Sequence, residues 1–294
     1  MTAQIRPLAA ADLPACEVIS SRAFFELDSR TYQRAWPGPT PRPESRADAW
    51  INRSLALLRT DPGGCWAAEV DGAVVGFATS LRRETLWVLA SYAVRPGLQG
   101  QGIGRQLLGA AASHGQGCLR AMVNSSQDQQ ALRRYRQAGF DTLPQMMVWG
   151  HVDRSLLPVV EHVRLGTESD YDLMDSLDRR ARHAGHGPDH GVLAAQHRLI
   201  VMDHATGQGY AWVDDKGSVA CLAADSRKSA GLLLWEALAS SAPDVPVEIG
   251  HISPANQWAL EVATAARLEI HLRGFLALRG LKDPTPYIPH STLL

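Results

Sequence analysis

The segment from Leu89 to Leu108 constrains this chain most, because it passes from strand to loop to helix within a short stretch. An apolar run of strand type turns at Pro96-Gly97, and the glycine-rich loop Gln99-Gly100-Gln101-Gly102-Ile103-Gly104 follows. Apolar residues then recur at helical spacing, at Ile103, Leu107, Leu108 and Ala111. The first amides of a helix have no intrahelical partner and carry the positive end of its dipole, and glycines allow a close approach to the backbone. The sequence therefore predicts an anion site here.

Composition sets the class of protein. The chain has 294 residues, 45% of them apolar and 20% charged, which suits one large globular domain or two of ordinary size. The 29 basic and 30 acidic residues nearly cancel, which argues against a nucleic-acid or anionic-membrane partner. We find neither an apolar run long enough to span a membrane nor the pattern of a signal peptide, and the four cysteines are scattered. We therefore expect a cytoplasmic protein.

The first half of the chain is expected to alternate helices and strands around a mixed sheet. Residues 36–46 contain four prolines and are expected to form a loop. Asp71-Gly72 is typical of a tight hairpin turn, and Gly139 is expected to end a helix. The expected strands are 4–8, 65–70, 74–79, 84–94, 119–123 and 146–149, and the expected helices are 11–25, 47–60, 103–111 and 129–138.

Two other phosphate-binding loops fit the glycine-rich segment poorly. Its spacing is not that of the Rossmann GxGxxG loop, and we find no acidic residue on a second strand about 20 residues later. A nucleotide-binding P-loop needs Gly-Lys followed by Ser or Thr, and the segment has no lysine.

Two motifs in order resemble the GCN5-related N-acetyltransferase (GNAT) superfamily. The first is Gln99-x-x-Gly102-x-Gly104 after a strand, and the second contains Ala131, Tyr135, Gly139 and Phe140, with Asp128 where the family pattern has Asn. The resemblance implies an α/β fold, a mixed and mainly antiparallel sheet flanked by helices. It also implies acetyl-CoA or another acyl-CoA as the donor of the acyl group. A chain with two GNAT copies and a Tyr-Ile-Pro tail also resembles the bacterial holothin N-acyltransferase-type subgroup.

The resemblance assigns roles to particular residues. The pyrophosphate of the cofactor would lie on the amides of Gln99, Gly100, Gln101, Gly102, Ile103, Gly104 and Arg105. The backbone of Tyr92, Ala93 and Val94 would pair with the pantetheine arm, and the N–H of Val94 could stabilise the oxyanion. Tyr135 would protonate the departing thiolate. Asp128 is a further cofactor-binding candidate, although its position also suits a helix N-cap.

The general base has no sequence signature. Glu26 and Asp28, near the end of the first long helix, and Glu84, before the central strand, are substrate-site candidates. Solvated surface carboxylates are the alternative interpretation of all three.

The second half of the chain repeats the first in a degraded form. We predict a catalytic domain over residues 1–150 and a degenerate GNAT-like domain, with an extended C-terminal tail, over residues 151–294. The loop before Gly231 lacks the glycine spacing, Ala263 stands in the place of Tyr135, and Arg267-Leu268 stands in the place of Gly139-Phe140. This half is therefore expected to have lost both the phosphate site and the proton donor.

A histidine-rich segment, from His183 to His190, also falls in this half. Gly185, Gly187 and Pro188 would break a helix that aligned its side chains, so we expect a loop and no metal site.

The function that these motifs predict is N-acyl transfer from acyl-CoA to the primary amine of a small molecule, by a monomer or homodimer. A protein or peptide N-acetyltransferase and a non-catalytic acyl-CoA-binding regulator are the alternatives.

Overall fold

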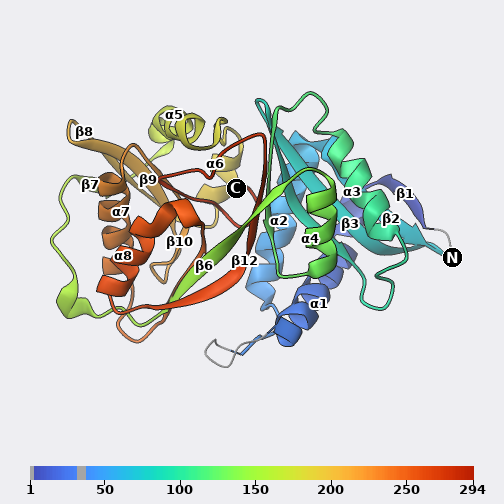
Figure 1. The fold of residues 1–294 in the computed structure, drawn as a ribbon, viewed down its shortest axis with the longest axis horizontal. Coiled ribbons are helices and arrows are strands. Elements are labelled where there is room, and N and C mark those ends of the chain that lie inside the picture. The colour runs from blue at the N-terminus through green and yellow to red at the C-terminus, as the bar shows by residue number, and fades with distance from the viewer. Residues whose placement is uncertain (1–2, 32–37) are drawn as a thin grey trace. The chain divides into compact units, whose positions relative to one another are not determined.

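A computed structural model describes residues 3–31 and 38–294, and its contacts divide the chain into two compact units (Figure 1). Unit 1 comprises residues 1–121 and 128–134, and unit 2 comprises residues 122–127 and 135–294. Both units combine helices with mainly antiparallel strands, which confirms the predicted α/β class. Within the described residues, no helix is both long enough and apolar enough to cross a membrane.

Unit 1 is built on the antiparallel strands β1-β2-β3-β4. Its elements are β1 (Gln4–Pro7), α1 (Leu13–Thr31), α2 (Glu44–Thr60), β2 (Cys65–Val70), β3 (Ala73–Arg83), β4 (Leu86–Val94) and α3 (Ile103–Ser113). On β3, Phe77 packs edge-on against Trp50 of α2, whereas Gly76 faces Leu107 of α3. Successive residues of a strand point to opposite faces, so α2 and α3 cover opposite faces of this sheet.

Unit 2 contains two groups of strands, ordered β5-β12-β6-β11 and β13-β10-β9-β8-β7. The helix α4 (Gln129–Gln137) crosses the division between the units after residue 134. The other elements are β5 (Arg120–Ser125), β6 (Asp141–Gly150), β7 (Val163–Leu165), α5 (Tyr171–Arg182), α6 (Asp189–Ala194), β8 (Arg198–His204), β9 (Gly207–Val213), β10 (Val219–Ala224), α7 (Arg227–Ala239), β11 (Val247–Ile252), α8 (Gln257–Ala265), β12 (Glu269–Arg279) and β13 (Tyr287–Ile288).

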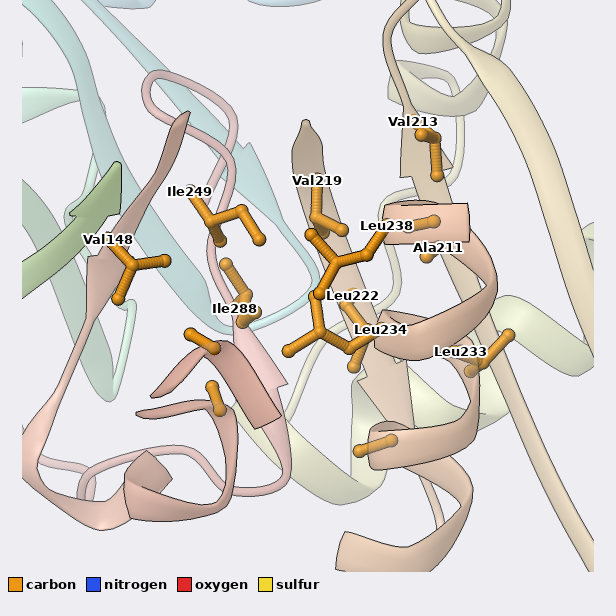
Figure 2. Packing of buried hydrophobic residues seen from close by; sticks show 14 of the residues in the cluster. Val148, Ala211, Val213, Val219, Leu222, Leu233, Leu234, Leu238, Ile249 and Ile288 are labelled. Atoms are coloured by element: carbon orange, nitrogen blue, oxygen red, sulfur yellow. The ribbon is translucent and has the colours of Figure 1, made fainter. Parts of the chain in front are cut away.

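The core of unit 2 lies where α7 packs against the strands (Figure 2). Leu234 and Leu238 of α7 are fully buried against Leu222 of β10, and Ile288 of β13 belongs to the same cluster. Fully burying an aliphatic side chain contributes about 1.5–3 kcal/mol, so these contacts hold the helix and the C-terminal strand in place.

The two halves share a local device that supports the predicted repeat. In unit 1, Arg6 donates to both carboxylate oxygens of Asp12, at 2.8 and 2.9 Å, between the first strand and the first helix. In unit 2, Arg164 donates to both oxygens of Asp170, at 2.9 and 2.6 Å, in the corresponding place. Each carboxylate also accepts a backbone N–H three residues before it, as in a helix-capping box.

Several element boundaries differ from the sequence expectation. The helix α2 begins at Glu44, inside the expected loop 36–46, because the proline-rich stretch ends at Pro43 and the Glu44 carboxylate suits a helix N-terminus. Residues 36 and 37 of that loop lie outside the described residues. The strand expected from Glu84 begins instead at Leu86, because Glu84 has a φ of +51° and lies in the turn.

The strand β6, which the sequence places in the first domain, packs in unit 2. It pairs with β12 on one side and β11 on the other, and both partners come from the last 50 residues or so of the chain. Neither β12 nor α6 is among the elements expected from the sequence.

Candidate functional site

The loop predicted to hold phosphate starts with a tight turn. Leu98 N–H donates to the Arg95 carbonyl at 3.1 Å, and the two central residues are Pro96 and Gly97. Gly97 has a φ of +83°, so this is a type II turn, which favours proline and then glycine at these positions. The turn reverses the chain directly after β4 and leads it towards the start of α3.

Glycines shape the rest of the loop. Gly100 and Gly102 have φ values of +82° and +84°, in the left-handed region that glycine adopts without strain. A Cβ added to either would meet no described atom within 4 Å, so the backbone here is open to a ligand. As the N-cap of α3, Gly102 has no side chain that could accept a bond from the first amides of the helix. The sequence-predicted anion site thus has the required backbone geometry.

The end of β4 directs alternate backbone groups away from β3. The N–H of Arg95 donates to Val75 of β3 at 2.8 Å. Backbone directions alternate along a strand. The N–H groups of Tyr92 and Val94 therefore point away from β3, whereas the N–H group of Ala93 points towards it. The Gln99 side chain donates to the Val94 carbonyl at 3.2 Å, which ties the loop to this strand. Of the three residues predicted to pair with pantetheine, Tyr92 and Val94 have the suitable direction.

A bulge interrupts β4 upstream of these residues. Thr79 is opposite Ser91 and Ser80 is opposite Leu89, so Ala90 is an extra residue on β4. A bulge bends its strand and increases its twist, and bulges are common beside functional sites. Sequence reasoning missed it, because Leu89-Ala-Ser contains no glycine to mark it.

The Tyr92 side chain packs directly on the start of α3. A Cβ added at Gly104 would lie 2.1 Å from the Tyr92 hydroxyl, so any larger residue there would force Tyr92 to move. Arg134 of α4 bonds to the same hydroxyl. Although burial raises the pKa of Tyr92, the Arg134 guanidinium opposes the shift. Arg134 therefore brings a half-buried positive charge to the predicted phosphate site, which sequence reasoning missed because the second motif leaves this position unspecified.

Asp128 is the N-cap of α4. Its Oδ1 atom accepts the N–H of Gln130 at 2.7 Å and that of Ala131 at 3.0 Å. The capping interpretation from the sequence is therefore confirmed. A cofactor contact of Asp128 stays a prediction.

Tyr135 belongs to the C-terminal cap of α4. Phe140 N–H donates to the Tyr135 carbonyl at 3.0 Å, and Gly139 N–H donates to the Arg136 carbonyl at 3.1 Å. Gly139 has a φ of +82°, so the turn is a Schellman motif, and the Tyr135 and Phe140 rings supply its usual apolar contact. The Gly-Phe pair of the second sequence motif thus has a structural role. The Tyr135 side chain is only 4% exposed.

The three base candidates lie on exposed parts of unit 1. Glu26 and Asp28 are exposed on α1, and Glu84 is exposed in the turn between β3 and β4. Their role as general base stays a prediction.

The second half keeps the backbone turn that ends α4 but not the tyrosine of that turn. Leu268 N–H donates to Ala263 at 2.9 Å, Arg267 N–H donates to Thr264 at 3.1 Å, and Arg267 has a φ of +68°. This is the Schellman turn of Gly139 with arginine in the left-handed position and Ala263 in the place of the tyrosine.

Protein groups fill the places that a cofactor would need in the second half. The Ser226 hydroxyl caps α7 by accepting the N–H of Ser229 at 3.1 Å, and Asp225 accepts the Ser229 hydroxyl at 2.7 Å. The C-terminal strand β13 pairs with Leu222 and Ala223 of β10. In the strand order, β10 occupies the position in its sheet that β4 occupies in unit 1.

Part of the histidine-rich segment belongs to a buried polar cluster. Asp178, His186 and His190 each offer one ligand atom, and these atoms lie within 4.8 Å of one another. All three side chains are fully buried. The glycines do prevent a continuous helix, but His186 lies in the loop before α6, His190 lies on α6, and Asp178 comes from α5.

The comparisons with known proteins agree with this geometry. Residues 22–140 match the model of the acetyltransferase (GNAT) family. No curated protein has a significantly similar sequence. A proposed acetyltransferase from Pyrococcus horikoshii has a similar structure, with a TM-score of 0.73 and 18% identity over 99% of this chain and 95% of that one.

Two further crystal structures cover nearly the whole chain. A GCN5-related N-acetyltransferase from Sphaerobacter thermophilus has a TM-score of 0.61 and 17% identity over 99% of this chain and 98% of that one. A tandem GNAT protein from the clavulanic acid biosynthesis pathway has a TM-score of 0.53 and 16% identity, with 96% and 99% covered. At these identities the structures show the fold alone. The family match over residues 22–140 and these structures together show that the chain resembles the GNAT acetyltransferases and that a tandem GNAT-type fold extends over nearly its whole length.

Proposed function

We propose that the chain transfers an acetyl group, or another small acyl group, from acyl-CoA to the primary amine of a small molecule. The observation that carries this proposal is the start of α3, where two left-handed glycines lead into a helix whose N-cap has no side chain. A pyrophosphate suits such a helix start, because several amides and the helix dipole act on it together.

The positive charges around this loop support the same ligand. Arg105 is exposed in the first turn of α3, and Arg134 bonds to Tyr92 beside Gly104. Guanidinium groups bind phosphate oxygens well because they donate in a fixed planar fork. The backbone of Tyr92 and Val94 points away from β3 and would accept the pantetheine amides as a strand partner would.

The chemical step needs no covalent enzyme intermediate. The neutral amine attacks the thioester carbonyl and forms a tetrahedral oxyanion, which the N–H of Val94 would stabilise. Collapse of this intermediate breaks the C–S bond and releases the CoA thiolate, and the Tyr135 hydroxyl would give that thiolate a proton. The amide product keeps the acyl group, and the proton that the amine loses passes to a base or to water.

Only one cofactor is expected to bind per chain. In the second half, the Ser226 hydroxyl caps the start of α7, Asp225 accepts the Ser229 hydroxyl beside it, and β13 occupies the edge of β10. An acyl-CoA would have to displace these protein groups in order to bind there. Titration calorimetry with acetyl-CoA should therefore give a stoichiometry near one, and two equal sites would contradict this part of the proposal.

A screen of an amine library that follows the release of CoA thiol tests the activity. With an accepted amine, Tyr135→Phe is expected to lower kcat about 100-fold, a typical loss for a general acid, and to leave the Kd of acetyl-CoA nearly unchanged. The substitution keeps the ring that packs on Phe140 and removes only the hydroxyl.

Phe140→Leu is the matched control for packing. It alters the apolar contact of the Schellman turn but keeps the Tyr135 hydroxyl. If Phe140→Leu lowered kcat as much as Tyr135→Phe, or if Tyr135→Phe were fully active, the hydroxyl would have no role in proton transfer.

A further inference from the structure

The buried cluster in unit 2 has two histidines whose hydrogen bonding is incomplete. His186 Nδ1 lies 2.7 Å from Asp178 Oδ2, and His190 Nε2 lies 3.0 Å from Asp175 Oδ1. The other ring nitrogen of each histidine, His186 Nε2 and His190 Nδ1, is buried without a hydrogen-bond partner among the described residues. A buried polar atom without a partner costs about 1–3 kcal/mol, so two in one cluster call for a ligand that is not part of the chain.

The histidines are held as metal-binding histidines usually are. A metal ligand histidine typically gives its second nitrogen to a carboxylate, which fixes the ring and its tautomer. Asp175 does this for His190 and thereby leaves Nδ1 as the nitrogen that can bind a metal. Asp178 is fixed in turn, because its Oδ1 accepts the hydroxyl of Tyr210 at 2.6 Å.

The backbone of the segment is fitted closely to this arrangement. A Cβ added at Gly185 would lie 2.6 Å from the Asp175 carboxylate, and Gly187 has a φ of +54°. Gly187 N–H donates to Asp175 at 3.0 Å. The loop therefore holds His186 near α5 with little freedom, and preorganised ligands raise metal affinity.

The charges of the cluster favour a divalent cation. Asp175, Asp178 and Asp189 lie around it, and Arg182 is the buried cation beside them. The Arg182 guanidinium donates to the carbonyls of Ala184, Gly185 and Leu293, so its N–H groups are directed at backbone. Asp178 is fully buried within reach of both histidines, and its negative charge favours a cation between them when both imidazoles are neutral.

We propose that Asp178, His186 and His190 bind a divalent transition-metal ion of the zinc class. Two imidazole nitrogens and a carboxylate oxygen form a donor set that suits Zn²⁺ better than Mg²⁺ or Ca²⁺, which prefer oxygen ligands. Because the three side chains are fully buried, the ion is structural and ties α5 to the loop before α6. This inference does not depend on the proposed acyl transfer.

The test uses the full-length chain and two measurements of metal. The chain as purified is analysed by inductively coupled plasma mass spectrometry, and the chelator-treated chain is then titrated with Co²⁺ while its visible d–d absorption is recorded. We expect about one zinc-class ion per chain and d–d bands between roughly 500 and 650 nm, as a low-coordinate site with nitrogen and oxygen ligands gives. If the folded, chelator-treated chain bound neither Co²⁺ nor Zn²⁺, the site would be a water-filled polar cluster and the proposal would fail.

Variants distinguish this cluster from other histidines. His190→Gln is expected to weaken Co²⁺ binding at least 100-fold, and Asp175→Asn to weaken it about 10- to 100-fold through the lost support of His190. His183→Asn is the matched control, since His183 is exposed in the same segment, and it should bind as the wild type does.

Surface binding is the competing outcome. His162 and His204 stack with their ring centroids 3.9 Å apart, which makes them the obvious alternative ligands. If His204→Gln abolished the Co²⁺ bands while His190→Gln, folded by circular dichroism, kept them, the buried cluster would not be the metal site.

Discussion

Gly104→Ala should damage the proposed cofactor site through a single contact. The added Cβ would lie 2.1 Å from the Tyr92 hydroxyl and 3.2 Å from the carbon that bears it. An ordinary contact needs about 3.4 Å or more, so the hydroxyl must move by more than 1 Å and weaken its bond to Arg134. Overpacking of this kind costs about 1–3 kcal/mol, and we expect a loss near 2 kcal/mol in the free energy of unfolding.

A double-mutant cycle identifies the contact. Tyr92→Phe removes the hydroxyl and its bond to Arg134, at a cost of about 1 kcal/mol, but it also makes room for the new methyl group. The double variant Gly104→Ala/Tyr92→Phe should therefore lose about 1 kcal/mol rather than the 3 kcal/mol of an additive pair. The resulting coupling of about 2 kcal/mol is within the range for residues in direct contact.

Urea denaturation measures the stabilities, and calorimetry measures the Kd of acetyl-CoA for the same proteins. Gly104→Ala should raise this Kd about tenfold, since the helix start and Tyr92 are displaced together. Gly109→Ala is the control on the exposed side of α3, where a Cβ would meet nothing within 4 Å, and it should be neutral or stabilising by up to about 1 kcal/mol. Additive losses in the cycle would refute the argument that this glycine is required by the tyrosine.

Three further substitutions test the packing of the fold. Arg267→Gly should raise the free energy of unfolding by about 1 kcal/mol, because Arg267 has a φ of +68°, and Gly139→Ala at the equivalent turn should lower it by about as much. Urea denaturation checks both, and changes of the same sign would contradict the shared turn. Asp61→Asn should cost about 3 kcal/mol at pH 7, because it leaves the buried Arg83 without its carboxylate partner, 2.8 Å away. Although burial raises the pKa of Asp61, hydrogen bonds from Thr60, the Arg82 amide and Arg83 hold it below the ordinary 3.8, so its stabilisation is present above about pH 4 and is lost as the pH falls further. Unfolding measured from pH 7 to pH 2 should therefore depend less on pH in Asp61→Asn than in the wild type.

The parts of the site that could be predicted from the sequence are those with local causes. Gly100 and Gly102 adopt the left-handed backbone, which glycine takes without strain and without help from distant residues. The strand, the loop and the helix start can therefore be predicted from residues that are neighbours in the sequence. Gly139 is predictable for the same reason, as the residue that ends α4. The GNAT resemblance rests on these local signals, and the comparisons confirm it.

The features that the sequence did not predict depend on partners distant in the chain. The strand β12 reaches from residue 269 to 279 and lies between β5 and β6, a pairing that no local pattern encodes. Arg134 matters because Tyr92 happens to meet it, more than 40 positions earlier in the sequence. The sequence likewise drew attention to the segment of His186 and His190 but not to Asp178, because Asp178 is contributed by a different helix from His190.

We propose that the second half binds no acyl-CoA, and one substitution should not create a site there. Ala263 stands where the tyrosine would be, but it is fully buried in the core shared by α7 and α8, where a phenol ring would overpack its neighbours. The start of α7 is already capped by Ser226, and the edge of β10 is already paired with β13. Each of these contacts stabilises unit 2, so an acyl-CoA would have to replace hydrogen bonds that the protein now makes with itself. Ala263→Tyr should therefore lower the free energy of unfolding without adding a second acetyl-CoA site, and a second site in calorimetry would contradict this proposal.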